Sequence, residues 1–311
     1  MHTRQAFSAE WGETSGMPLF PGFESHRVQT EDAEIFLRRK GEGPPLLLLH
    51  GYPQTHAMWH AVAPALAQRF TVVCADLRGY GDSSKPRGTP DHGSMSKRAM
   101  AADMVEAMAK LGFDRFMVAG HDRGGRVTHR MCLDHADAVT KAALLDIVPT
   151  RTLFDATNKA LAEGYYHWFF LTRPFDFPER LIGADPIYYL HAKLGSWSGG
   201  KSAGFAHPQA MAEYERCFSD PATIHSSCED YRAAATIDLE HDRADETARI
   251  GCPLLVLWGR HGLMEKHFDV LETWRAKASG PVSGEALDCG HYLPEEAPEA
   301  TLERLEAFFA D

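Results

Sequence analysis

The chain has 311 residues, and 44% of them are hydrophobic, which is enough for a large core and normal for one α/β unit with an insertion. The formal net charge of −11 at pH 7 argues against nucleic acid and against an anionic membrane surface as partners. An anionic substrate would therefore have to be attracted locally, by particular arginines.

Short apolar runs alternate with helical segments along the chain. Strands are predicted over residues 45–50, 70–76, 116–120, 142–147 and 253–258. A helix is predicted from Ser96, a capping residue, to Leu111, with Gly112 as its stop. Unbroken apolar strands separated by helices indicate a parallel sheet that is covered on both faces, so the expected fold class is α/β.

Residues 151–245 interrupt this alternation. The stretch is rich in aromatic residues, has helical character, and falls between two predicted core strands. Ligand sites of open α/β sheets lie at the carboxyl ends of the strands, so an insertion here is expected to form a lid over the site. The expected organisation is a core over residues 1–150, a helical cap over 151–245 and the rest of the core over 246–311. Most of the cap aromatics are expected to form the cap's own core.

Cysteine usage and the N-terminus bear on the compartment. The six cysteines are scattered without a Cys-x-x-Cys pair, and we expect reduced, mostly buried thiols in a cytoplasmic protein. The segment 1–6 lacks an apolar signal, and no apolar run approaches the ~18 residues that a membrane span needs.

His56 and His60 have a spacing that suits a metal, but no third ligand accompanies them. Neither a metal nor another cofactor is therefore expected.

The most informative segment is Gly120-His121-Asp122-Arg123-Gly124, which lies between a predicted strand and a predicted helix. A strand, a sharp turn with glycines on either side of one reactive residue, and a helix form the nucleophile-elbow layout, in which serine is usual. A carboxylate is already ionised at neutral pH and can displace a leaving group from a saturated carbon. Asp122 therefore favours dehalogenation or epoxide opening over esterase chemistry. The alternative interpretation is that Asp122 only caps the helix.

An elbow nucleophile needs an acid and a histidine later in the chain. His291, in a Gly-His pair after the last predicted strand, suits the histidine. No acidic residue follows the penultimate strand until Glu265, so we prefer Asp146, at the end of the strand after the elbow, as the acid. The alternative interpretation is that Asp146 is a cap or turn residue. The backbone N–H groups of Tyr52 and Arg123 would form an oxyanion hole, for which the side chain of Tyr52 matters less than its position.

Over nearly its whole length the chain resembles the fluoroacetate (haloacetate) dehalogenases of the α/β-hydrolase superfamily. The segments Leu48–His56 and Asp76–Gly81 and the elbow glycines are shared across the superfamily and are weakly specific. The arginines of the elbow, with His167-Trp168 and Tyr231, are far more specific. The resemblance implies an α/β-hydrolase fold, with a mostly parallel eight-stranded sheet flanked by helices and an inserted helical cap, and it implies a homodimer.

The resemblance also implies a role for each site residue. Asp122 resembles the nucleophile, His291 the base that activates water, and Asp146 its acidic partner. Arg123 and Arg126 resemble a clamp on the substrate carboxylate. Arg126 lies one helical turn beyond Asp122, and guanidinium groups bind carboxylates bidentately, so the chemistry agrees. The alternative interpretation is that both arginines make surface ion pairs.

His167, Trp168 and Tyr231 resemble a halide pocket. Fluoride is a small, strongly hydrated leaving group, and its displacement requires donors that replace the lost water. An imidazole, an indole and a phenol offer three such donors. The alternative interpretation is that these residues pack the lid and have satisfied polar tips.

The expected function is hydrolytic dehalogenation of a short, anionic 2-haloacid, with fluoroacetate giving glycolate and fluoride through an aspartyl ester. The first alternative is an epoxide hydrolase, which normally has tryptophan after the nucleophile and two lid tyrosines as acids. Arg123 replaces that tryptophan here and also counts against a neutral haloalkane. A second alternative is a ligand receptor of the same fold, but receptors usually lose part of the triad, and here every role has a candidate.

Overall fold

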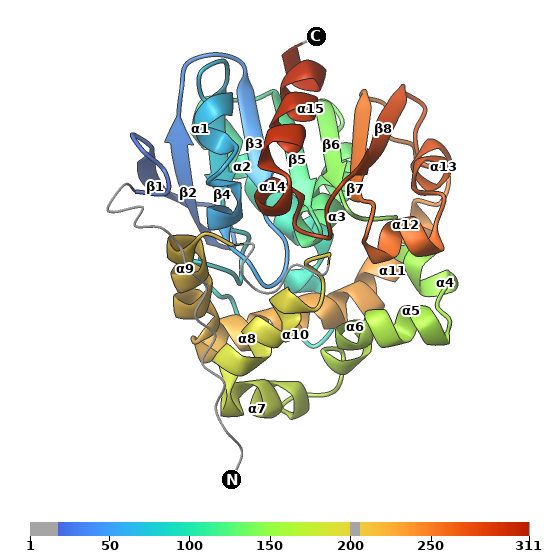
Figure 1. Ribbon diagram of the computed structural model, residues 1–311. Helices are drawn as coiled ribbons and strands as arrows, with labels where there is room; N and C mark the ends of the chain where they lie inside the picture. The colour runs from blue at the N-terminus through green and yellow to red at the C-terminus, as the bar shows by residue number, and fades with distance from the viewer. Residues whose placement is uncertain (1–17, 200–205, 311) are drawn as a thin grey trace.

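A computed structural model of the chain describes residues 18–199 and 206–310 (Figure 1). Within these residues, eight strands form one sheet in the order β1-β2-β4-β3-β5-β6-β7-β8. The strands are β1 (Glu24–Gln29), β2 (Glu34–Lys40), β3 (Pro45–Leu49), β4 (Thr71–Ala75), β5 (Phe116–His121), β6 (Val139–Leu145), β7 (Leu254–Gly259) and β8 (Val282–Leu287). The β1–β2 and β2–β4 pairs are antiparallel, and every other pair is parallel. The predicted mostly parallel, eight-stranded sheet is confirmed.

The five predicted strands correspond to β3–β7, with ends that differ by a few residues. These strands lie inside the sheet, and most of their residues are buried on both faces, which is why they read as continuous apolar runs. β1 and β8 alternate between exposed and partly buried residues because they lie at the sheet edges. Because their apolar pattern is weaker, the sequence did not predict β1 and β8, and it did not predict β2, the neighbour of β1.

Helices cover both faces of the sheet, as the sequence predicts. Figure 1 shows α1 (Ala63–Leu66) and α15 (Pro298–Ala310) in front of the strands, with α2 (Lys97–Lys110) and α3 (Arg123–Asp134) behind them. The predicted cap of α2 is confirmed, because the Ser96 hydroxyl accepts the backbone N–H of Ala99 at 3.2 Å. Three short helices accompany β7 and β8: α12 (Leu263–His267), α13 (Val270–Arg275) and α14 (Leu293–Glu296).

A group of helices lies in the chain between β6 and β7, below the carboxyl ends of the parallel strands in Figure 1. They are α4 (Thr150–Asp155), α5 (Lys159–Gly164), α6 (Tyr166–Phe170), α7 (Phe177–Ala184), α8 (Pro186–Gly195), α9 (Pro208–Phe218), α10 (Pro221–Ala235) and α11 (Ile237–Ala244). The described aromatic residues of this segment divide into those that are buried in the core or packed against it and those on and between α6–α8 that are exposed. No helix in the described ranges is long and apolar enough to span a membrane.

Candidate active site

The elbow is a strained turn between β5 and α3. Asp122 has a φ of 44° and a ψ of −110°, a conformation that side chains other than glycine seldom adopt. Gly124 allows the turn to pack tightly, because a Cβ there would lie 2.5 Å from the carbonyl oxygen of His50. The same oxygen accepts the backbone N–H of Gly124 at 2.8 Å. The turn is thus fixed against the end of β3, with Asp122 at its apex.

The Asp122 carboxylate is buried and does not cap the helix. Although Asp122 occupies the N-cap position of α3, its side chain makes no capping hydrogen bond. Oδ2 instead accepts the backbone N–H of Tyr52 at 3.0 Å. Gly51 leaves room for this contact, since a Cβ there would lie 2.6 Å from the Cβ of Asp122. The interpretation of Asp122 as a mere cap is therefore wrong.

The groups around Asp122 keep it ionised. Burial by itself would raise the pKa of this carboxyl, but the neighbouring rings of His291 and His121 and the guanidinium groups of Arg123 and Arg126 act in the opposite direction, and the pKa lies below its usual value. Asp122 is only 1% exposed. The carboxylate is therefore anionic at neutral pH and poorly hydrated, which suits a nucleophile.

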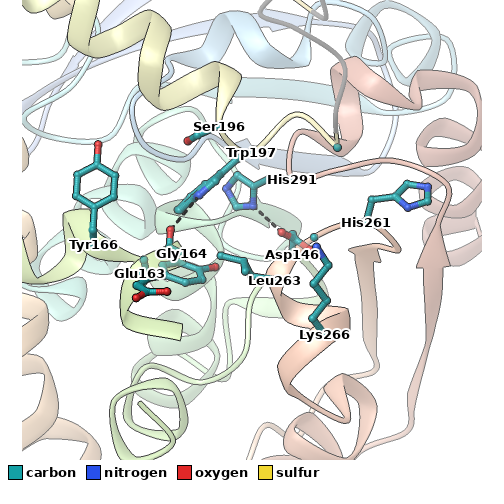
Figure 2. A pocket seen from close by; sticks show the side chains of 13 residues that line it. Asp146, Glu163, Gly164, Tyr166, Ser196, Trp197, His261, Leu263, Lys266 and His291 are labelled. Carbon is teal, nitrogen blue, oxygen red and sulfur yellow. Dashed lines mark hydrogen bonds and ion pairs between the residues drawn. The ribbon is translucent and has the colours of Figure 1, made fainter. Parts of the chain in front are cut away.

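His291 and Asp146 lie side by side at the strand ends (Figure 2). Nδ1 of His291 donates to Oδ2 of Asp146 at 2.6 Å. Asp146 follows β6 with a φ of 52°, and its Oδ1 accepts the backbone N–H of Gly259, at the end of β7, at 2.9 Å. Nε2 of His291 is buried and has no hydrogen-bond partner in the described part of the chain. Glu265, the first acid after β7, accepts the indole N–H of Trp258 instead.

His121, a neighbour of Asp122 in the elbow, holds the loop that carries His291. Its Nε2–H donates to the carbonyl oxygen of His291 at 2.7 Å, and the two rings lie 4.5 Å apart between centroids. Burial lowers the pKa of His121 to about 3, so the ring is neutral. Sequence reasoning gave His121 no role, and its place beside the apex of the elbow was the only available signal.

A cavity of about 490 Å³ reaches the His291–Asp146 pair (Figure 2). Its wall also includes Tyr165, Trp197 and Lys266. The Trp197 ring packs on both His291 and His167, with centroids 4.7 Å away in each case, and its carbonyl accepts the N–H of His291 at 3.0 Å. Asp122 is not among the residues that line this cavity, whereas Trp197 lines it and also contacts His167.

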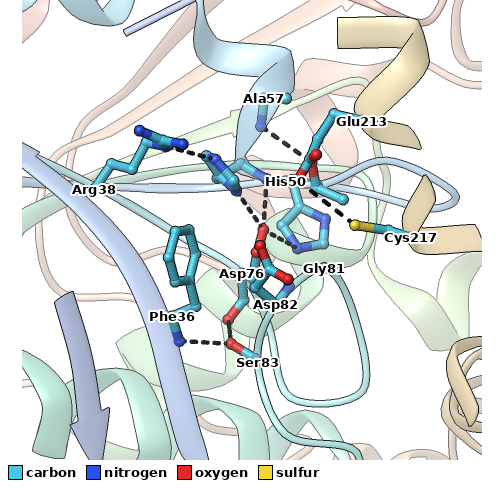
Figure 3. A network of polar contacts seen from close by, with 12 residues as sticks. Phe36, Arg38, His50, Ala57, Asp76, Gly81, Asp82, Ser83, Glu213 and Cys217 are labelled. Atoms are coloured by element: carbon cyan, nitrogen blue, oxygen red, sulfur yellow. Dashed lines mark hydrogen bonds and ion pairs between the residues drawn. The ribbon is translucent and has the colours of Figure 1, made fainter. Parts of the chain in front are cut away.

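The loop that carries Tyr52 is tied to β4 through a buried carboxylate, Asp76 (Figure 3). Its Oδ1 accepts the backbone N–H and the ring Nδ1–H of His56 at 2.7 and 2.9 Å, and Oδ2 accepts the backbone N–H of Asp82 at 2.9 Å. Nε2 of His56 accepts from Nε of Arg38 at 3.0 Å. Both ring nitrogens of His56 therefore serve this network. In the described residues, no three His, Cys, Asp or Glu side chains are grouped to hold a metal.

We expect Asp76→Asn to destabilise the fold by about 2–4 kcal/mol at pH 7. Burial alone would raise the pKa of Asp76, but His56 and His50 hold it well below its usual value. A depressed folded-state pKa contributes stability above the ordinary value of about 4, and this contribution is lost as the pH falls through the acid range. Urea unfolding should therefore show a difference in the free energy of unfolding between wild type and variant, and this difference should narrow below about pH 4.

Asp82→Asn is the matched control, because its backbone N–H to Asp76 remains and its side chain contacts Arg216 in a partly exposed ion pair. This change should alter stability by less than about 0.5 kcal/mol. Equal losses for both variants would contradict a structural role for the Asp76 carboxylate.

Arg123 is fully buried and oriented by Asp230. Nε and Nη2 donate to the two carboxylate oxygens of Asp230 at 2.8 and 2.6 Å, whereas Nη1 has no partner among the described residues. Asp230 also accepts the hydroxyl of Tyr80 at 2.7 Å and the ammonium of Lys97. Asp230 received no role from the sequence, although it directly precedes Tyr231 in a segment that the resemblance covers. The pairing joins residues that are 107 positions apart, and no local pattern reveals that.

Arg126 is buried without a carboxylate partner in the described structure. Its Nη1 donates to the carbonyl oxygen of Val148 and to the hydroxyl of Thr150, both at 3.0 Å. Nε and Nη2 have no partner, and the guanidinium lies 4.5 Å from the ring centroid of Trp168. Burial, and next the charge of Arg123, lower the pKa of Arg126, so an anion at this place would be stabilised. The interpretation that both arginines make surface ion pairs is wrong.

His167 and Trp168 on α6 and Tyr231 on α10 face one another inside the protein. The Tyr231 ring lies 5.3 Å from the His167 ring and 5.7 Å from the Trp168 ring, and the Arg123 guanidinium lies 4.2 Å from its centroid. In the described part of the chain, Nε2 of His167, Nε1 of Trp168 and the Tyr231 hydroxyl are buried without partners. The interpretation of satisfied polar tips is therefore wrong. Each buried polar group without a partner lowers the stability of the folded protein by about 1–3 kcal/mol, so this cluster indicates a site for a polar ligand.

The Tyr52 side chain contributes more than the sequence indicated. Its ring is parallel to the His167 ring at 6.0 Å, and it meets the Tyr231 ring edge-on at 5.3 Å. The hydroxyl lies 3.3 Å from that of Tyr189 on α8. Tyr52 thus supports the buried donors with its ring while its N–H contacts Asp122. The N–H of Arg123, at the first position of α3, has no carbonyl one turn earlier in the helix to bond.

Comparisons with known proteins agree with this fold. Residues 44–298 match the family model for the alpha/beta hydrolase fold. A fluoroacetate dehalogenase from a Burkholderia species is 46% identical over 94% of this chain and 96% of its own length. A soluble epoxide hydrolase from Corynebacterium sp. strain C12 is 35% identical over 92% of this chain and 96% of its own length. A solved structure from Nostoc sp. PCC 7120, assigned there to the alpha/beta hydrolases, is 57% identical over 93% of this chain and 98% of that one, with a TM-score of 0.91.

Proposed function

The chain belongs to the α/β-hydrolase family, and we propose that it is a hydrolytic dehalogenase that converts fluoroacetate and related short 2-haloacids to 2-hydroxyacids and halide. One observation carries this proposal: an ionised, buried Asp122 shares its interior site with unpaired guanidinium N–H groups and with unpaired ring donors of the cap. The identity of 46% to a fluoroacetate dehalogenase supports the same reaction.

In the first step, the substrate carboxylate pairs with Nη1 of Arg123 and with Nε and Nη2 of Arg126, the nitrogens that lack partners in the described structure. This clamp offsets the repulsion between the substrate and the Asp122 carboxylate. An Asp122 oxygen attacks the α-carbon with inversion, the C–O bond forms, and the carbon–halogen bond breaks. The halide leaves with both bonding electrons, and the three cap donors receive it.

In the second step, Nε2 of His291 takes a proton from water, and the oxygen of that water attacks the ester carbonyl of Asp122. Asp146 stabilises the imidazolium that forms. The backbone N–H groups of Tyr52 and Arg123 stabilise the tetrahedral oxyanion. Collapse of this intermediate releases the 2-hydroxyacid and regenerates the Asp122 carboxylate, and the proton held by His291 leaves with the product or to solvent.

The direct test measures fluoride and chloride release from fluoroacetate and chloroacetate with ion-selective electrodes. We expect halide and 2-hydroxyacid in equal amounts. A single turnover in oxygen-18 water should place the first label in Asp122, because water attacks the ester at the aspartate carbonyl. Label in the first glycolate released would contradict the covalent step, and an absence of halide release from both acids would contradict the function.

The second candidate is an epoxide hydrolase, which the identity of 35% to the Corynebacterium enzyme supports. Burial raises the pKa of Tyr231 well above its usual value, so its phenol stays protonated and could donate to an epoxide oxygen. The buried Arg123 and Arg126 disfavour a neutral epoxide beside Asp122. Hydrolysis of styrene oxide without halide release from haloacetates would reverse the ranking.

We expect Arg126→Gln to raise KM for haloacetates by about 100-fold, because it removes a charge-assisted, bidentate partner of the substrate carboxylate. Steady-state kinetics check this value. Arg151→Gln is the control: this arginine lies on α4, pairs with Glu246 at 3.2 Å, and should leave KM unchanged. A loss of kcat with unchanged KM in the Arg126 variant would contradict the clamp.

The helices α4–α11 are proposed to act as the cap over the site, with the predicted limits 151–245.

The outer surface of these helices supports the proposed homodimer, because large apolar side chains gather on and between α6, α7 and α8. The exposed residues are Tyr166, Phe169, Phe175, Phe177, Leu181, Ile187 and Tyr188. Light scattering after gel filtration should give the mass of a dimer for the wild type, and Phe177→Asp should shift this mass toward that of the monomer.

The six free thiols fit the proposed cytoplasmic location.

A further inference from the structure

Lys193 is a buried lysine that the two catalytic steps do not use. It lies on α8, where Leu190, Lys193 and Leu194 share the buried face at helical spacing. Its exposed fraction is 0%. A lysine is almost never fully buried unless it is paired, because desolvation of the ammonium is costly. Its position inside the cap therefore needs an explanation.

The surroundings of Lys193 are aromatic rather than acidic. Nζ lies 3.1 Å from Nδ1 of His167 and 3.5 Å from the ring centroid of Trp197, and the Tyr166 ring is 5.1 Å away. In the described part of the chain, Lys193 forms no salt bridge within 4.0 Å, and Asp122 is the one carboxylate whose charge acts to raise its pKa. The contact with Nδ1 of His167 is the one hydrogen bond that Nζ makes among the described residues.

The chemistry of Nζ favours Lys193 as the donor in this hydrogen bond. An ammonium has only donors, and a neutral amine still carries two N–H bonds. The negative face of the Trp197 indole attracts N–H groups and repels a nitrogen lone pair. Burial lowers the pKa of Lys193 well below its usual value, but the donor capacity toward Nδ1 remains in either protonation state. One N–H can lie on the face of Trp197 and another can donate to Nδ1 of His167. With Nδ1 as the acceptor, the neutral His167 ring carries its proton on Nε2.

We propose that Lys193 is a positioning residue that holds His167 in the tautomer with its proton on Nε2, aimed at the departing halide. This inference rests on the proposed dehalogenase function. Nε2 of His167 is buried beside Trp168 and Tyr231, where no partner takes it up in the described structure. With the proton on Nδ1 instead, Nε2 would present a lone pair to an anion. Lys193 thus decides whether His167 is a donor or a repulsive acceptor.

The effect of Lys193 should depend on the halide. Fluoride is compact, holds its negative charge on one small atom, and needs strong donors as it leaves. Bromide is a weaker hydrogen-bond acceptor and a better leaving group. A lost or misdirected donor at His167 should therefore slow the displacement of fluoride far more than that of bromide.

The test compares Lys193→Met, which removes the donor, with Lys193→Gln, whose amide N–H can still donate to Nδ1. For fluoroacetate, Lys193→Met should lower kcat by about 100-fold with KM nearly unchanged. For bromoacetate, kcat should fall by less than about 5-fold, since the leaving group needs the donor less. Lys193→Gln should restore most of the rate with fluoroacetate. Equal losses with both halides would overturn the proposal.

Nitrogen-15 NMR of histidine-labelled resting enzyme reads the tautomer directly, with the His167 signals assigned from their loss in His167→Gln. Wild type should show a protonated Nε2 and a bare Nδ1, and Lys193→Met should shift the proton toward Nδ1. A protonated Nδ1 in wild type would overturn the proposal even if Lys193→Met fails to fold. The NMR experiment needs no turnover. If the wild-type enzyme released no halide, the proposed function would be contradicted, but the NMR signals would still show whether Lys193 fixes the tautomer of His167.

Discussion

Replacing Asp122 by asparagine is expected to lower kcat for halide release from haloacetates by at least about 10⁴-fold. The amide is uncharged and is a poor nucleophile, so the bond to the α-carbon does not form. Asparagine nearly matches aspartate in size, so the tight contacts with Gly51 and Tyr52 should survive and the variant should fold. Fluoride and chloride electrodes measure the rate, and intact mass spectrometry checks that the asparagine has not deamidated back to aspartate.

The matched control for this variant is Asp114→Asn, which changes an exposed aspartate just before β5. It should leave kcat and KM within about 2-fold of wild type, as surface substitutions away from the site usually do. Full turnover by Asp122→Asn would show that the reaction does not use this carboxylate. A receptor of the same fold would show no turnover in either protein, with ligand binding retained.

The parts of the fold that the sequence predicts are those encoded by a local pattern. β3 to β7 are buried on both faces, so their residues form unbroken apolar runs that can be located without any partner. The elbow is equally local, since Gly120, Asp122 and Gly124 occupy one turn. The edge strands depend on a neighbouring strand for their register, and their half-exposed residues leave a weak trace in the sequence.

The contacts that were not predicted join segments far apart in the chain. Asp230 orients Arg123 across 107 positions, and Lys193 reaches His167 from another helix, 26 positions away. In the sequence, a charged residue on a helix is indistinguishable from one that faces solvent until the neighbouring helix is placed. The sequence thus predicts which residues carry the chemistry, whereas the residues that orient them follow from packing between the cap and the core.

His291→Gln should uncouple the two proposed steps. Nε2 of His291 is buried and without a partner in the described structure, and the Asp146 carboxylate fixes the other ring nitrogen. The histidine acts only on water, so the variant should still displace one halide. We expect a burst of about one fluoride per active site, followed by a steady rate at least about 10³-fold below wild type. Mass spectrometry after an acid quench should find a glycolyl group on the peptide that contains Asp122.

His261→Gln is the control for this variant, because His261 lines the same cavity near His291, yet its exposed side chain pairs only with Asp288 in the described structure. It should keep full steady-state turnover and show no trapped ester. Loss of both the burst and the steady rate in His291→Gln would mean that the first step also needs this histidine, which would contradict its assignment as the base for water. A burst with a trapped ester would instead link Asp122 and His291 to successive steps, because the ester can persist only where attack at saturated carbon has occurred and hydrolysis has failed.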